Sequence, residues 1–221
     1  MTAIKICGIT EVEHALAAAE AGANFVGLVF ATSKRQVTAV RARQIALALE
    51  HVQSRPKTVG IFVNSSSLEV NQTVDWCHLD WVQLSGDEPW DFCRSVERPV
   101  IKAVRVQGPE RSIDIMASII LGHKIIGMKE FIPLLDSHVE GLFGGTGHVF
   151  DWDVAQEVAK WYPIVLAGGL SPDNVAQAIQ VVQPWGVDVS SGVETEGMKD
   201  IEKIRRFCLA AREADEMRPQ R

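Results

Sequence analysis

The chain has few cysteines and none of the patterns that make cysteine structural. Its four cysteines include no C-x-x-C pair and no cysteine–histidine cluster with zinc-finger spacing. A disulfide-stabilised or metal-stabilised fold is therefore not expected, and a reducing compartment fits best. The longest apolar runs are only as long as strands, which excludes a transmembrane helix. The N-terminal MTAIKICG has neither region of a signal peptide, so we expect a cytoplasmic protein.

Positive charge is also scarce. Lysine and arginine together number 22 against 28 acidic residues, for a formal net charge of −6. This balance argues against binding to nucleic acid or to an anionic membrane. It does not exclude a phosphorylated small molecule, because a few backbone N–H groups directed at one point can bind phosphate on an acidic protein.

Short apolar or β-branched runs recur along the whole chain and alternate with stretches of helical periodicity. The expected strands are 3–7, 24–30, 58–63, 81–85, 99–104, 131–136, 163–168 and 186–191. One helix is expected from the T-E-V-E capping box at Thr10 to Gly22, and another from Ser171 and Pro172.

Eight such units predict an α/β fold, a single (β/α)8 TIM barrel with eight parallel strands, as one domain over residues 1–221. An open doubly wound sheet is the alternative, but no G-x-G-x-x-G follows any strand to support dinucleotide binding. No linker rich in proline, serine or glycine divides the chain. We expect the charged tail 212–221 to fray and the pattern to be least informative over 105–130.

The active site of a barrel lies at the carboxyl ends of its strands, where two consecutive turns are rich in small residues. Gly168 and Gly169 follow the seventh strand, and Ser190, Ser191 and Gly192 follow the eighth. Backbone and hydroxyl donors here predict a phosphate site; the alternative is a pair of ordinary tight turns.

Cys7 and Asp136 end the first and sixth expected strands. A thiol lowered in pKa by nearby cations and a carboxyl raised by a dry surrounding could remove and donate protons, as an isomerase requires. A buried core thiol and a helix-capping or ion-paired carboxylate are the structural alternatives.

Two further features have functional interpretations. The glycine-rich loop with Gly144, Gly145, Thr146 and Gly147 suits a lid over substrate, or an exposed loop. Arg35 could hold a carboxylate with two parallel hydrogen bonds.

Strand periodicity makes a separate prediction about the barrel interior. Lys5 shares a face with Cys7, and Asp188 shares a face with Ser190 on the neighbouring strand. We expect Lys5 and Asp188 to form a buried ion pair below the site. Gln83 and Lys102 are expected in a polar network of the core.

Eight motifs run in order over nearly the whole chain and resemble phosphoribosylanthranilate isomerases. They are KICGIT at 5–10, GIFVN at 60–64, VQLSGDE at 82–88, VIKAVR at 100–105, LLDS at 134–137, GGTGHVFDW at 144–152, LAGGLSPDNV at 166–175 and VDVSSGVE at 187–194.

The resemblance implies a cofactor-independent isomerase of tryptophan biosynthesis, with a phosphorylated small molecule as its substrate. It would convert N-(5′-phosphoribosyl)anthranilate to 1-(2-carboxyphenylamino)-1-deoxyribulose 5-phosphate by an Amadori rearrangement. Cys7 matches the family's general base and Asp136 its general acid. Arg35 matches the arginine that holds the anthranilate carboxylate, and the two small-residue turns match the phosphate site.

Two positions depart from the family pattern: Ser85 stands where the family usually has histidine, and His148 where lysine is common. Two alternative functions fit the sequence less well. A histidine-pathway aminoaldose isomerase would use two strand-end aspartates, and Cys7 and Val104 stand near those positions instead. A non-catalytic ligand-binding barrel would not need a thiol base.

Overall fold

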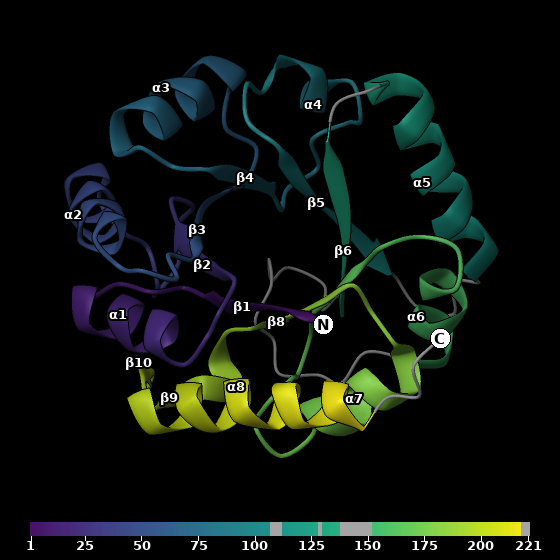
Figure 1. The fold of residues 1–221 in the computed structure, drawn as a ribbon. Helices are drawn as coiled ribbons and strands as arrows, with labels where there is room; N and C mark the ends of the chain where they lie inside the picture. Colours follow the sequence, from purple (N-terminus) through teal and green to yellow (C-terminus); the bar gives the residue numbers. More distant parts are fainter. Residues whose placement is uncertain (107–111, 128–129, 138–151, 218–221) are drawn as a thin grey trace.

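The eight predicted strands close into a parallel barrel in the order β1 to β8, and the helices form a ring around it (Figure 1). This computed structural model describes residues 1–106, 112–127, 130–137 and 152–217. The predicted fold class is confirmed. No helix in these ranges is long and apolar enough to cross a membrane.

The observed strands begin and end close to the expected positions. The barrel strands are β1 (Ala3–Cys7), β2 (Phe25–Val29), β3 (Lys57–Phe62), β4 (Trp81–Leu84), β5 (Val100–Val106), β6 (Phe131–Ser137), β7 (Val165–Leu166) and β8 (Gly186–Val189). The helices are α1 (Val12–Glu20), α2 (Ala39–Glu50), α3 (Ser67–Cys77), α4 (Phe92–Ser95), α5 (Ser112–Ile126), α6 (Trp152–Ala159), α7 (Val175–Val182) and α8 (Ile201–Glu216). A 3-10 turn, η1 (Ser191–Val193), and a hairpin of β9 (Glu194–Thr195) with β10 (Met198–Lys199) lie between β8 and α8.

The apolar core has two parts, because successive strand residues point to opposite faces of the barrel wall. One cluster fills the barrel interior with side chains such as Phe25, Trp81, Ile101 and Leu134. The larger cluster lies between the strands and the surrounding helices. The filled interior leaves only the strand ends for a site, as in other barrels of this kind.

The expected start of α1 is wrong because a tertiary contact replaces the capping box. The helix begins at Val12 after Glu11, with no capping bond from a side chain. Arg41 of α2 instead pairs with the Glu11 carboxylate and donates to the Thr10 carbonyl at 3.1 Å. The expected end is confirmed, since Gly22 follows the helix with a φ of +83°.

The expected start of α7 at Ser171 and Pro172 is about one turn too early for the regular helix, although the expected cap is made: Ser171 Oγ accepts a hydrogen bond from the Asp173 amide at 3.3 Å. The helix begins at Val175. The Asn174 side chain accepts a hydrogen bond from the Ser171 amide at 2.8 Å and donates one to the Gly169 carbonyl at 2.9 Å. These bonds hold residues 171–174 in a turn against the preceding loop.

The tail expected to fray from residue 212 continues α8 to Glu216 instead. Arg212 donates to the carbonyl oxygens of Thr2 and Gly22, each at 2.8 Å, and Asp215 accepts from the Thr2 hydroxyl at 2.7 Å. These bonds join the end of the chain to its beginning. Residues 218–221 lie outside the described ranges.

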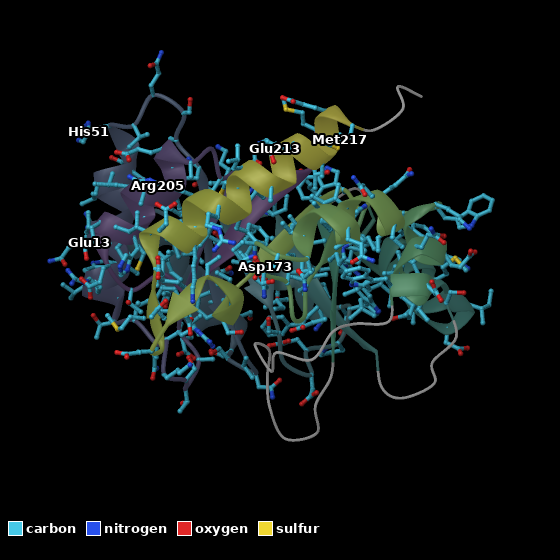
Figure 2. The ribbon with its side chains drawn as sticks, turned by 90° about the horizontal axis from the view of Figure 1, so that it is seen from below. Glu13, His51, Asp173, Arg205, Glu213 and Met217 are labelled. Atoms are coloured by element: carbon cyan, nitrogen blue, oxygen red, sulfur yellow. The ribbon has the colours of Figure 1, made fainter. Side chains whose placement is uncertain are left out.

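Replacing Arg212 by methionine should lower the free energy of unfolding by about 2 kcal/mol, because charged hydrogen bonds to two backbone carbonyls are lost. Arg205 provides the matched control on the same helix, where its side chain lies at the surface (Figure 2) and is 54% exposed. Arg205→Met should change stability by less than about 0.5 kcal/mol. Chemical denaturation measures both variants, and equal losses would contradict the proposed anchoring role of Arg212.

Candidate active site

Cys7 and Asp136 lie at the same rim of the barrel, as expected. Cys7 is the last residue of β1, and Asp136 precedes the last residue of β6. Asp136 shares its strand face with Leu134, which belongs to the interior cluster. Gly27 leaves room for the thiol, since a Cβ there would lie 3.1 Å from Cys7 Sγ.

The predicted buried ion pair is confirmed directly below the thiol. Lys5 Nζ lies 2.9 Å from Asp188 Oδ1, and the two residues are register partners across β1 and β8. Both side chains are buried. Burial lowers the pKa of Lys5, but Asp188 and Cys7 raise it, and the net shift is upward. Lys5 therefore keeps its positive charge beneath Cys7, balanced by the carboxylate of Asp188.

Burial changes the pKa of the Cys7 thiol more than the positive charge of Lys5 does. Burial raises the pKa of Cys7 above its ordinary value, and Asp188 adds to the increase. Lys5 and Lys199 act in the opposite direction without reversing the shift. The expectation that cations would lower this pKa is therefore wrong for the protein without ligand.

The two small-residue turns after β7 and β8 contact each other. Gly168 and Gly169 have φ values of +86° and +65°, which favour glycine. A Cβ on Gly192 would lie 1.9 Å from the carbonyl oxygen of Leu170, so only glycine allows this approach. Ser191 and Gly192 open η1, and the first N–H groups of a helix have no partner within it.

Arg35 lies beside the second turn. An added Cβ on Gly8 would lie 2.5 Å from Arg35 Cδ and 3.3 Å from Ser190 Oγ, so the arginine stem crosses Gly8 near Ser190. Its Nε and Nη2 donate to the Glu194 carboxylate at 2.5 and 3.0 Å. The bidentate grip expected of Arg35 is thus made with a carboxylate of the chain itself.

The carboxylate of Glu194 also forms ion pairs with two lysine side chains. Lys199 Nζ donates to Glu194 Oε1 at 2.8 Å and to the Ser190 carbonyl at 2.9 Å. Lys34 Nζ lies 3.4 Å from Glu194 Oε2. Burial raises the pKa of Glu194, but hydrogen bonds from Arg35 and Lys199 outweigh it and bring the pKa to about 2.

Sequence reasoning missed Glu194, Lys199 and Asn174 as parts of this region. The signals were present: E-T-E-G-M-K reads as a two-residue hairpin that sets its first and last side chains beside each other. Asn174 belongs to the motif LAGGLSPDNV at 166–175, but no function was predicted for its side chain. No local pattern, however, indicates that the hairpin reaches Arg35.

The other residues predicted from the sequence are Gln83, Lys102 and those of the glycine-rich loop. Gln83 donates to Ser85 Oγ at 3.0 Å, and Lys102 lies buried 3.4 Å from Glu88 Oε2, so both take part in polar networks. Gly144, Gly145, Thr146, Gly147 and His148 lie outside the described residues. Within the part of the chain that is described, no three histidine, cysteine or acidic side chains group as metal ligands.

Comparisons with known proteins agree on one family. A family model described as N-(5′-phosphoribosyl)anthranilate (PRA) isomerase matches residues 4–210. An N-(5′-phosphoribosyl)anthranilate isomerase of Dehalococcoides mccartyi is 46% identical over 215 residues, covering 97% of this chain and 98% of the relative. One from Pseudomonas fluorescens is 49% identical over 211 residues, 94% of each chain.

Solved structures agree as well. The phosphoribosylanthranilate isomerase of Thermotoga maritima superposes with a TM-score of 0.82 at 37% identity, covering 96% of this chain and all of the other. A further structure is that of such an isomerase in complex with reduced 1-(o-carboxyphenylamino)-1-deoxyribulose 5-phosphate. Its TM-score is 0.79 at 36% identity, with 96% of this chain and all of the other covered.

Replacing Asp188 by asparagine should lower the free energy of unfolding by about 3–5 kcal/mol, because the Lys5 charge would stay buried without its partner. The double variant Lys5→Met with Asp188→Leu should recover most of this loss. Urea denaturation measures both. A loss below about 1 kcal/mol in Asp188→Asn would show that Lys5 does not depend on this partner.

Glu194 should also make stability depend on acid. Its folded pKa lies below the ordinary value, so its contribution is present above about pH 4.3 and is lost as pH falls through about 2. The shift corresponds to a contribution of the order of 3 kcal/mol to the free energy of unfolding at neutral pH. Denaturation across this pH range should show a smaller decline in Glu194→Gln than in the original chain. Parallel curves would contradict the lowered pKa.

Proposed function

The chain belongs to the N-(5′-phosphoribosyl)anthranilate isomerase family, and we propose that Cys7 and Asp136 are the general base and general acid of its reaction. The reaction is the rearrangement of N-(5′-phosphoribosyl)anthranilate to 1-(2-carboxyphenylamino)-1-deoxyribulose 5-phosphate in tryptophan biosynthesis. One observation carries the proposal: both side chains lie at the carboxyl ends of their strands, on the strand faces that point into the barrel.

Asp136 acts first, as an acid on the furanose ring. Its proton passes to the ring oxygen while the bond from that oxygen to C1′ breaks, and the anthranilate nitrogen lone pair forms the C1′–N double bond of a protonated Schiff base. Cys7 as thiolate then removes the C2′ proton. The electron pair of that C–H bond forms a C1′–C2′ double bond, and the C–N electrons return to nitrogen. Tautomerisation to the ketone follows.

The raised pKa of Cys7 has a consequence for this step. Before substrate binds, the thiol holds its proton at neutral pH, and this proton must pass to solvent before the thiolate can act as the base. Lys5 beneath it and Lys199 beside it favour the thiolate, and so reduce the cost of forming the base inside a dry site. Both steps are proton transfers, for which the protein's own groups suffice; we therefore propose that no cofactor takes part.

The two anionic ends of the substrate have separate binding groups. The turns at Gly168–Gly169 and Ser190–Gly192 would bind the phosphate through backbone N–H groups and serine hydroxyls. Arg35 would bind the anthranilate carboxylate. Cys7 lies between these groups around the barrel, because β1 pairs on one side with β2, which precedes Arg35, and on the other with β8, which precedes the Ser190 turn.

Replacing Cys7 by alanine or Asp136 by asparagine should lower kcat by about 10²–10⁴-fold, because each removes one proton-transfer group. Binding of reduced 1-(o-carboxyphenylamino)-1-deoxyribulose 5-phosphate should change by less than about threefold, since neither group serves chiefly to bind. Turnover is followed by anthranilate fluorescence, and binding by calorimetry.

Cys93→Ala and Asp114→Asn are the matched controls, since neither residue ends a barrel strand: Cys93 is buried in the cluster outside the barrel, and Asp114 is an exposed residue of α5. Both should keep the original kcat. If Cys7→Ala or Asp136→Asn kept it as well, that residue would lose its proposed role.

A further inference from the structure

A continuous series of hydrogen bonds through the side chains of Glu194 and Lys199 connects Arg35 to the turn after β8. Arg35 donates two hydrogen bonds to Glu194, Lys199 donates to the same carboxylate, and Lys199 also donates to the Ser190 carbonyl. We propose that Glu194 and Lys199 are positioning residues that hold Arg35 and the Ser190 turn in one fixed arrangement for the two anionic ends of the substrate. This inference rests on the proposed roles of Arg35 and of the turn.

The hairpin after β8 brings the two residues together. β9 and β10 are antiparallel, and Glu194 is the register partner of Lys199. Glu196 and Gly197 form the turn with φ values of +53° and +83°, as a tight hairpin requires. The pair is therefore set by backbone pairing rather than by flexible side chains alone.

The start of α8 fixes this hairpin in place. Lys203 Nζ donates to the Glu194 carbonyl at 2.7 Å. Asp200 caps α8 by accepting from the amides of Glu202 and Lys203, and it also accepts from the Thr195 hydroxyl at 2.7 Å. A helix of sixteen residues thus supports the short hairpin.

The hydrogen bonds to Glu194 leave Arg35 able to bind a second carboxylate. A guanidinium has five N–H donors in one plane, and Glu194 takes one from Nε and one from Nη2. Fixing this edge sets the plane of the group and leaves the other edge for a ligand. Only 14% of the Arg35 side chain is exposed, so its orientation is restricted.

The charge balance also favours an incoming anion. Lys34, Arg35 and Lys199 surround the single carboxylate of Glu194. Because the pKa of Glu194 is about 2, this carboxylate is ionised at neutral pH. The cluster then keeps an excess of positive charge, although the whole chain is acidic.

The test compares Glu194→Gln with Glu196→Gln, which removes the same charge from an exposed position of the same hairpin. Glu194→Gln should weaken binding of reduced 1-(o-carboxyphenylamino)-1-deoxyribulose 5-phosphate by roughly tenfold, as for other coupled contacts. KM should rise more than kcat falls. Glu196→Gln should match the original chain, and thermal melting must show that both variants are folded at the assay temperature.

A double-variant cycle decides whether Glu194 acts through Arg35. In an Arg35→Met background, Glu194→Gln should cause almost no further loss of affinity. The same tenfold loss in both backgrounds, or equal behaviour of Glu194→Gln and Glu196→Gln, would overturn the positioning role. Unchanged affinity in Arg35→Met alone would instead refute the proposed carboxylate contact of Arg35, and this inference with it.

Lys199→Gln tests the other half of the link, and it does not depend on Glu194→Gln being folded. Inorganic phosphate is the probe, measured as a competitive inhibitor of turnover. Its inhibition constant should rise several-fold in Lys199→Gln and stay unchanged in Lys160→Gln, which removes a lysine that is 51% exposed and follows α6. An unchanged inhibition constant in Lys199→Gln would overturn the connection to the Ser190 turn.

Discussion

The pairing of β1 with β8 is the constraint on which the rest of the site depends. This pairing closes the barrel, and its register sets Lys5 opposite Asp188. The buried ion pair lies beneath the rim, and one step further along each strand face come Cys7 and Ser190. A shift of the register by one residue would turn these side chains to the opposite face and separate the proposed base from the proposed phosphate turn.

The same pairing of β1 with β8 suggests how an acidic chain would bind a substrate with two anionic ends. Net charge acts at long range and is screened by salt, whereas the site uses donors in direct contact. In the proposed complex, backbone N–H groups would bind one end and Arg35 the other. Glu194 adds a negative charge among these donors, but three cations surround it, so the carboxylate orients the cluster without cancelling it.

Periodicity in the sequence was enough to predict the barrel, its strand ends and the Lys5–Asp188 pair, because alternation and strand order are local or nearly local properties. The starts of α1 and α7 were missed, since Arg41 and Asn174 reorganise the first turns through contacts that a capping pattern does not contain. The Arg35–Glu194 pair joins residues 159 positions apart. The direction of the Cys7 pKa shift depends on how dry the rim is, which composition does not reveal. The cytoplasmic location and the lid stay predictions.

The most direct test of acid–base catalysis at this rim is a crystal structure of the chain with reduced 1-(o-carboxyphenylamino)-1-deoxyribulose 5-phosphate. The account predicts that Cys7 Sγ lies about 3.5 Å from C2′, as reacting groups do in a productive complex. Asp136 should lie on the side of the C4′ hydroxyl, whose oxygen is the ring oxygen of the substrate, with the carboxylate at Arg35 and the phosphate between the turns. The account would be contradicted by an analogue bound with its carboxylate and phosphate exchanged, or by a C2′ atom too far from Cys7 Sγ for proton transfer.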